Sequence, residues 1–270
     1  IPIDPSVDVL KLLVGAGGTR GNSANDGSTR SGGQGVSGVG NGGNGKGRAG
    51  GGGAVTGIFK GTISHANSVL IAAGGAGGGA DGAGYNGGRG GADTGEDGTG
   101  IAPGHGGTQS AGGAKANSNA TDGSALTGGN GNVDGYAGGG AGYYGGGGGV
   151  GAGAGSNYSH PDNENAVSIR GKNDTDPDYP GGVIGKGGPN GASGAQGANG
   201  GNGWAIITYY NGNPQTGGGV SSALLEPLTR EWKRLSIAAD SGVTLKHPSA
   251  VPFEFNCLVG GDTATTDANT

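Results

Sequence analysis

Side chains that could bind metals or do redox chemistry are few in this chain and widely spaced. The single cysteine, Cys257, has no partner for an intrachain disulfide and lies in an apolar stretch, which indicates a buried, unreactive thiol. Neither Cys257 nor any second histidine stands close enough to a histidine to repeat the spacing of zinc ligands. The sequence therefore predicts no zinc site. The histidines are at positions 65, 105, 160 and 247.

One acidic stretch, NDTDPDYPG, offers the best case for a metal ion. Asp174, Asp176 and Asp178 alternate as the first ligands of a calcium loop do. An EF-hand loop needs glycine at its sixth position and glutamate at its twelfth, whereas this chain has Tyr179 and Gly185 there. We therefore interpret the stretch as an exposed acidic turn without metal, and a calcium site is the alternative.

Glycine-rich nucleotide motifs carry no information here, because 75 of the 270 residues are glycine and loose matches arise throughout. No glycine loop is followed by the Lys-Ser or Lys-Thr pair of a phosphate loop. The net charge of −5 argues against nucleic acid as a partner, since phosphate binding needs a basic face. No apolar run reaches the roughly 18 residues of a membrane span. We expect no enzymatic activity, no cofactor and no membrane span.

Aromatic side chains are the remaining candidates, through contact rather than catalysis. Tyrosine presents a rigid amphipathic face at a small entropic cost, which suits the binding of proteins and sugars alike. Six of the eight tyrosines lie in the glycine-rich body of the chain. The alternative is that these rings pack against strands and belong to the core. The predicted binding residues are Tyr143, Tyr144, Tyr158, His160 and Tyr179.

Short apolar runs predict the strands that must position these rings. Each run is rich in β-branched or aromatic residues and is bounded by glycine or asparagine, which is typical of β-strands. A polar break from His65 to Ser68 separates two of the runs and predicts a hairpin. The predicted strands lie near residues 7–14, 54–63, 68–73, 165–170 and 204–210.

Glycine dominates the segments between these strands and often recurs at every third position. The register is unbroken from Gly182 to Gly203, and a second run extends from Gly139 to Gly151. A period of three fits polyproline II geometry, which has about 3 residues per turn and no internal hydrogen bonds. Collagen is disfavoured, because the longest run contains only Pro189. We therefore predict a bundle of polyglycine II helices that hydrogen-bond to one another, and a flexible linker is the alternative.

Several stretches carry a resemblance to known proteins: GIFKGTI, then VLIAAGGAGGG, and a late GNGWAIITYY, all after a first strand and a glycine tract. Over about residues 5–211 the chain resembles the glycine-rich domain of bacteriophage tail-fibre tip adhesins. More distantly, it is similar to the glycine-rich ectodomain of the anaplastic lymphoma kinase receptor family. The resemblance implies a small β-sandwich whose inserts form a polyglycine II bundle. The chain lacks the cysteines of the receptor ectodomain, which favours the phage group.

The composition becomes ordinary towards the C-terminus. We predict a glycine-rich domain at 1–211, a linker at 212–219 and a C-terminal docking or oligomerisation segment at 220–270. The predicted fold class is all-β or irregular. It comprises a small β-sandwich with long glycine-rich inserts, which form a bundle of polyproline-II-type helices, and a short mixed C-terminal segment.

Within the C-terminal segment the pattern predicts one short helix. Pro227 suits its first turn, and Leu228, Trp232 and Leu235 share one helical face. Two apolar runs that follow predict strands at 242–247 and 252–259.

These features predict a non-enzymatic receptor-binding adhesin of a phage tail fibre, which recognises a bacterial surface protein or glycan through loops of the bundle. The alternative is a structural subunit of an extracellular filament or virion appendage, assembled by exchange of segments between neighbours. Ice binding by a flat helical face is a third and weaker hypothesis. In the first two cases we expect an extracellular or virion-surface location within a larger assembly.

Overall fold

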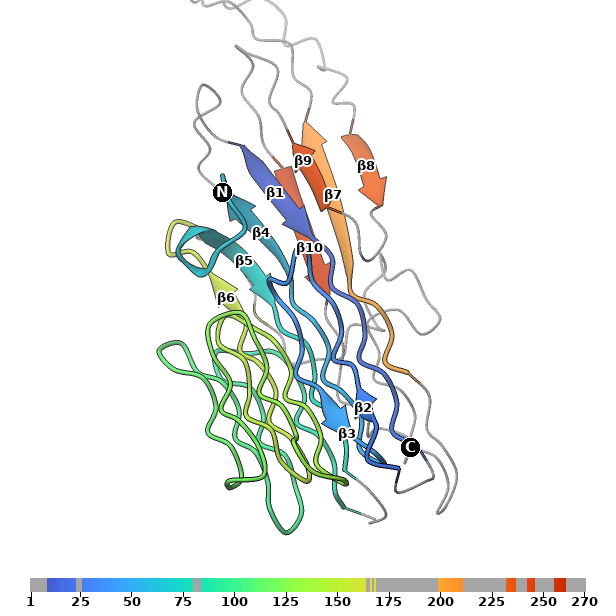
Figure 1. Ribbon diagram of the computed structural model, residues 1–270. Coiled ribbons are helices and arrows are strands. Elements are labelled where there is room, and N and C mark those ends of the chain that lie inside the picture. The colour runs from blue at the N-terminus through green and yellow to red at the C-terminus, as the bar shows by residue number, and fades with distance from the viewer. Residues whose placement is uncertain are drawn as a thin grey trace, which may run out of the picture.

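The computed structural model shows an all-β protein (Figure 1). In the part of the chain that it describes there is no α-helix, and the single helical element is a 3-10 turn, η1 (His65–Asn67). The all-β part of the predicted fold class is therefore confirmed. The described residues are 9–22, 26–79, 84–163, 166, 168, 199–210, 232–236, 242–245 and 255–260.

A five-stranded antiparallel sheet gathers apolar runs from distant parts of the chain. Its strand order is β6-β5-β4-β1-β9, and η1 joins β4 to β5 as a hairpin. β1 lies between β4 and the edge strand β9, with Leu12 opposite Ile58 on one side and Val243 on the other. The strands are β1 (Leu10–Leu13), β4 (Thr56–Lys60), β5 (Ser68–Ala72), β6 (Tyr158–Ser159) and β9 (Gly242–Leu245).

A second, three-stranded antiparallel sheet has the order β10-β7-β8. It consists of β7 (Trp204–Tyr210), β8 (Trp232–Ser236) and β10 (Phe255–Gly260). β10 lies against β4 and β5, so the two sheets face each other. Among the side chains that the structure places, the five largest that are fully buried lie on β1, β4 and β5: Phe59, Leu12, Leu13, Ile58 and Ile71. A short pair, β2 (Thr29–Arg30) and β3 (Gly45–Lys46), lies apart from both sheets.

The observed strands can be compared with the predicted ranges. β1, β4, β5 and β7 fall inside the ranges 7–14, 54–63, 68–73 and 204–210, and β9 lies inside 242–247. β10 overlaps 252–259 and extends to Gly260. The range 165–170 lies almost wholly outside the described residues, where only 166 and 168 are placed.

The helix predicted from Pro227 is wrong where the structure describes it, because Trp232–Ser236 form β8. Leu235 pairs with Ile207 and Trp232 with Tyr210 along the edge of β7. A helix of about two turns is marginal in water, and pairing with an existing strand satisfies the same backbone groups. The predicted C-terminal segment thus contributes β8, β9 and β10 to both sheets, and the boundaries at 211 and 220 stay a prediction.

The glycine-rich segments run side by side below the sheets in Figure 1 and hydrogen-bond through their backbones. One set of bonds closes a triangle between three segments, from Gly53 N–H to Gly75, from Gly74 N–H to Ala141 and from Ala141 N–H to Gly53. Three residues along each segment the triangle recurs, now between Gly50, Gly77–Gly78 and Gly138. The bonding therefore repeats with the same period as the glycines.

The segment Gly145–Val150 is enclosed by other glycine-rich segments, and all its residues are buried. Its six N–H groups donate in turn to three neighbouring segments and then to the same three again, over 2.8–3.2 Å. The accepting carbonyls are, in order, those of Ser124, Gly140 and His105, and then those of Thr121, Ala137 and Ala102. The carbonyls of Gly145 to Gly148 accept from three other segments, through the N–H groups of Gly113, Gly129, Gly153 and Ala116. The Gly149 carbonyl instead accepts from Ala137, to which Gly149 also donates. Six neighbours therefore surround this one segment, which we call the central segment.

Space, rather than backbone conformation, requires glycine in the central segment. No glycine from Gly145 to Gly149 has a positive φ, so an L-residue could adopt the same backbone. A Cβ added at any of the five would collide with the backbone of a neighbouring segment, as at Gly146 with the carbonyl of Gly153. Consecutive glycines therefore mark a segment that is enclosed on every side.

Candidate binding site

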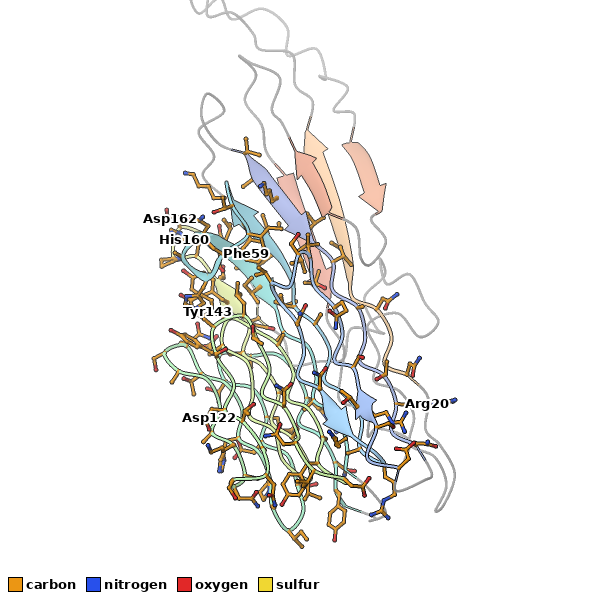
Figure 2. All side chains as sticks on the ribbon, in the orientation of Figure 1. Arg20, Phe59, Asp122, Tyr143, His160 and Asp162 are labelled. Atoms are coloured by element: carbon orange, nitrogen blue, oxygen red, sulfur yellow. The ribbon has the colours of Figure 1, made fainter. Side chains whose placement is uncertain are left out.

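Turns of the glycine-rich segments insert side chains into the core of the sheets. Val36 and Val39 from one turn, Leu126 from a second and Tyr143 from a third pack in one cluster with Phe59 of β4. The backbone N–H of Leu126 donates to the carbonyl of Tyr143 at 3.2 Å and joins two of these turns. Figure 2 shows Tyr143 where the glycine-rich segments meet β6, below Phe59. We call this region the junction.

At the junction four rings form one aromatic cluster: His65, Tyr143, Tyr144 and Tyr158. Tyr143 is stacked between His65, with ring centroids 4.1 Å apart, and Tyr158, at 4.0 Å. Tyr144 meets His65 edge-on at 4.7 Å and Tyr143 at 5.4 Å. These are favourable geometries for aromatic pairs. The cluster therefore connects η1, a turn of the glycine-rich segments and β6.

Burial sets the electrostatics of the cluster. The pKa of Tyr143 is raised, first by burial and then by its tyrosine neighbours Tyr158 and Tyr144. The pKa of His65 is lowered from 6.5 by burial, so the ring is neutral at pH 7. The Nε2 atom of His65 is buried and has no hydrogen-bond partner.

The structure brings three of the predicted binding residues together and separates a fourth. Tyr143, Tyr144 and Tyr158 share the aromatic cluster, and each is partly buried. Both faces of Tyr143 are covered, so its ring holds the junction together more than it offers a surface. His160 is exposed nearby, with its Nδ1 3.4 Å from Asp162, as Figure 2 shows at the edge of the sheet. Tyr179 lies outside the described residues.

His65 is a member of the cluster that sequence reasoning missed. It lies in the polar break from His65 to Ser68, which predicts a hairpin turn and gives His65 no further role. No local pattern places residue 65 beside residues 143 and 144, because the contact depends on how the glycine-rich segments pack. The signal in the sequence that could have singled out His65 is that histidine is rare, with four in 270 residues.

Among the described residues, the exposed large hydrophobic side chains lie at the far end of the glycine-rich segments, away from the sheets. Ile101 is 81 % exposed and Val133 is 38 % exposed. The bond from Val150 N–H to Ala102 (2.8 Å) places the Ile101 loop beside the last residue of the central segment. The bond from Ala137 N–H to Gly149 (2.7 Å) does the same for the Val133 turn. We call residues 99–103 and 132–136 the far-end loops.

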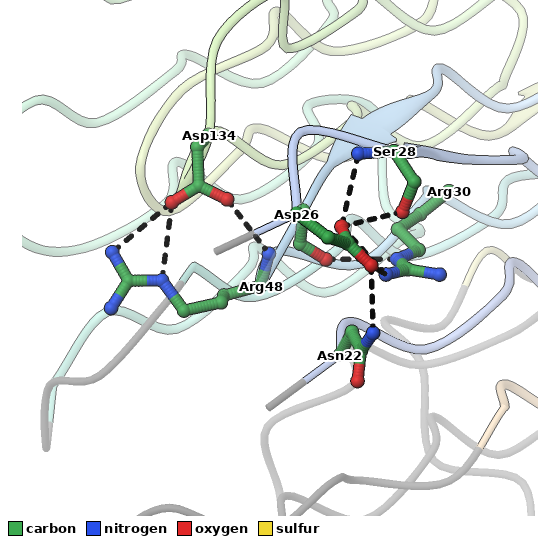
Figure 3. A network of polar contacts seen from close by, with 7 residues as sticks. Asn22, Asp26, Ser28, Arg30, Arg48 and Asp134 are labelled. Atoms are coloured by element: carbon green, nitrogen blue, oxygen red, sulfur yellow. Dashed lines mark hydrogen bonds and ion pairs between the residues drawn. The ribbon is translucent and has the colours of Figure 1, made fainter. Parts of the chain in front are cut away.

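Polar contacts fasten further turns of the glycine-rich part (Figure 3). Asp26 accepts bonds from Ser28 Oγ at 2.6 Å, from Asn22 Nδ2 at 2.9 Å and from Arg30 Nη2 at 3.0 Å. The Ser28 hydroxyl is the largest cause that holds the pKa of Asp26 well below its usual range. An ion pair joins Arg48 to Asp134 across 3.1 Å. These carboxylates are engaged by their own chain, which indicates a structural role.

Across the described residues, no three His, Cys, Asp or Glu side chains come together as metal ligands would. The acidic stretch from Asp174 to Asp178 lies outside those residues. None of the described helices has the length and apolar character that a membrane crossing requires.

Comparisons with known proteins found no match among protein-family models, curated proteins or solved structures. Function is therefore inferred from the residues and their geometry.

Proposed function

We propose that this chain is a non-enzymatic receptor-binding adhesin of a phage tail fibre, in which a polyglycine II bundle stands beside a small β-sandwich. It recognises a bacterial surface protein or glycan through the loops of the bundle and works on the virion surface, outside the cell. The observation that carries the proposal is the 81 % exposure of Ile101 at the far end of segments held together by backbone hydrogen bonds.

The polyglycine II conformation is supported by the direction of the backbone bonds. Helices of this type have about 3 residues per turn and no internal hydrogen bonds. The central segment sends each N–H group to another segment, and the direction repeats every three residues. Its six neighbours are the number that three donor and three acceptor directions allow.

A role in recognition is supported by where large side chains stand. Affinity depends on a few large anchors that become buried on contact, not on many small polar residues. Among the described residues, Ile101 and Val133 are the exposed large hydrophobic side chains, and both belong to the far-end loops. The backbone bonds of the bundle hold these loops to the central segment, so little conformational entropy remains to be lost on binding.

Binding of fluorescently labelled protein to a panel of bacterial strains tests the proposal. We expect saturable binding to a subset of strains, abolished by protease if the receptor is a protein and by periodate if it is a glycan. The variant Ile101→Ser should lose binding with an unchanged melting temperature. The control is His160→Ser, at the opposite end of the bundle.

The two variants distinguish a binding surface at the far-end loops from one at the junction. Loss of binding by His160→Ser, with Ile101→Ser unaffected, would move the contact surface to the junction, where the predicted residues Tyr144 and Tyr158 lie. Absence of saturable binding to every strain would contradict the adhesin proposal itself.

A specific observation also supports the alternative function, a structural subunit assembled by segment exchange. β9 pairs with β1 at the edge of one sheet, and β8 and β10 flank β7 in the other. Strands supplied by the C-terminal segment of a neighbouring subunit could make the same pairs. Electron microscopy of the purified protein distinguishes the two functions, because fibres with a repeating unit support the subunit and discrete particles support the adhesin.

A further inference from the structure

We propose that His65 is a pH-sensitive latch, which holds the β4–β5 turn against the glycine-rich bundle at neutral pH and releases it in acid. The latch is independent of the proposed adhesin function, because it concerns the attachment of the bundle to the sheets. It consists of the aromatic cluster already defined.

His65 forms a contact between two parts of the fold. The ring belongs to η1, the turn of the β4–β5 hairpin, and stacks on Tyr143 at 4.1 Å with an interplanar angle of 22°. It also meets the edge of Tyr144 at 4.7 Å. Tyr143 is in turn fixed to the bundle, because its N–H donates to the Ser156 carbonyl at 2.8 Å. Displacement of His65 therefore removes the aromatic contact between the hairpin turn and the bundle and leaves Ile63, which packs on the same core cluster as Tyr143, as a remaining apolar contact of the turn.

The buried Nε2 atom makes this contact sensitive to protonation. A neutral imidazole can keep its single proton on Nδ1 and leave Nε2 without one. An imidazolium carries a proton on both nitrogens, so protonation would place an N–H and a positive charge where no acceptor is available. Attraction of the cation to the tyrosine faces opposes this effect, but it supplies no acceptor for the buried N–H.

In the part of the chain that the structure describes, no charged group interacts with His65 in a way that would hold the protonated ring. Among the described residues, the titratable groups packed against His65 are the phenols of Tyr143 and Tyr144, with Tyr158 behind Tyr143. Within the described part of the chain, burial is the cause found for the lowered pKa of His65.

The lowered pKa of His65 determines whether acid strengthens or weakens the latch. The released turn binds a proton more readily than the latched one, so the latch is fully effective above pH 6.5. It weakens as the pH falls from there towards the lowered pKa of the latched state, by up to about tenfold in the closed-to-open ratio per pH unit.

Two measurements on the whole chain test the latch. Near-UV circular dichroism of the stacked tyrosines should fall reversibly as the pH drops below 6.5, and hydrogen exchange should accelerate at residues 64–67 and 143–144. The variant His65→Phe keeps a ring in the stack and cannot titrate, so its signal should stay constant over the same range. The control His160→Phe, at an exposed histidine, should behave as the wild type does.

Either of two results would overturn the latch. One is an equal pH response in His65→Phe, and the other is a wild-type signal that stays constant to pH 4. If His65→Phe does not fold, NMR titration of the four histidines in the wild type decides. A His65 pKa at or above 6.5 contradicts the proposal, and a clearly lower one, with the change in tyrosine dichroism at that pH, supports it.

Discussion

Two cores of different kinds meet at the junction. In the sheets, large side chains such as Phe59, Leu12 and Ile71 exclude water, and the burial of apolar area drives their association. In the glycine-rich part, the interior around Gly145–Val150 is backbone, held by hydrogen bonds between segments and by close contact where no Cβ intervenes. The two cores share one molecule but follow opposite rules of packing.

The difference predicts opposite responses to substitution. A side-chain core is weakened when atoms are removed, because a cavity remains. A backbone core is weakened when atoms are added, because neighbouring segments are too close to admit a methyl group. The central segment shows the second case, since a Cβ at Gly145 or Gly148 would meet a neighbouring carbonyl.

The largest expected effect is the addition of atoms to the central segment. Gly146→Val would drive a side chain into the carbonyl of Gly153 and disturb bonds to several neighbours at once. We expect the free energy of unfolding to fall by about 5 kcal/mol or more, which few single substitutions reach. Thermal and urea unfolding measure the change. The control is Ala114→Val, a comparable enlargement at an exposed residue of an adjacent segment. Equal melting temperatures for the two variants would show that the glycine-rich interior is not close-packed.

The second prediction removes atoms from the sheet core. Phe59 is fully buried in β4 and packs where the bundle turns enter. Phe59→Ala should lower the free energy of unfolding by about 4 kcal/mol through lost burial and a cavity. Phe59→Leu, which keeps most of the volume, should lose well under half of that. If both variants unfold at the wild-type urea concentration, the sheets contribute little and the bundle alone determines stability.

A smaller effect concerns the edges of the bundle, where asparagine side chains replace missing carbonyls. Asn44 Oδ1 accepts from Gly32 N–H at 2.9 Å, and Asn41 Oδ1 accepts from Gly35 N–H at 2.7 Å. Asn44→Ala should reduce stability by about 1–2 kcal/mol, because a partly buried N–H loses its acceptor. Asn44→Asp keeps an acceptor oxygen and should be closer to the wild type in the same melts. A greater loss from the aspartate variant would contradict this role.

The sequence predicted most of these strands because apolar runs bounded by glycine or asparagine are local patterns. The apolar runs that became β1, β4, β5 and β7 needed no knowledge of their partners. The predicted helix at β8 failed for the opposite reason, since its conformation is decided by the free edge of β7. Helical spacing over eight residues is a weak local preference that pairing with a strand overrides.

The candidate site was less accessible to sequence reasoning. The pair Tyr143 and Tyr144 could be singled out, but whether each ring is covered depends on residues far away in sequence, His65 and Tyr158. The period of three also failed to identify the central segment. A search for glycine at every third residue finds Gly145 and Gly148 as members of a run, whereas the consecutive glycines between them mark the enclosed segment. Ile101 gave no signal, because a single large apolar residue in a glycine-rich stretch is ordinary.

The smallest predicted effect has the opposite sign and tests the comparison most finely. Gly50 is buried in the bundle, yet a Cβ there would find its nearest atom, the Thr19 carbonyl oxygen, at 3.4 Å. Its φ is not positive, so alanine can adopt its conformation and loses less entropy on folding than glycine does. Gly50→Ala should therefore raise the free energy of unfolding by about 0.5 kcal/mol. In Gly52→Ala, two residues away, the added methyl group would collide with the Gly139 carbonyl. That variant should lower the free energy of unfolding by roughly several kcal/mol. Paired thermal melts measure the difference. If the two variants are destabilised equally, glycine is required throughout the bundle for its conformation, and the distinction between filled and open positions is wrong.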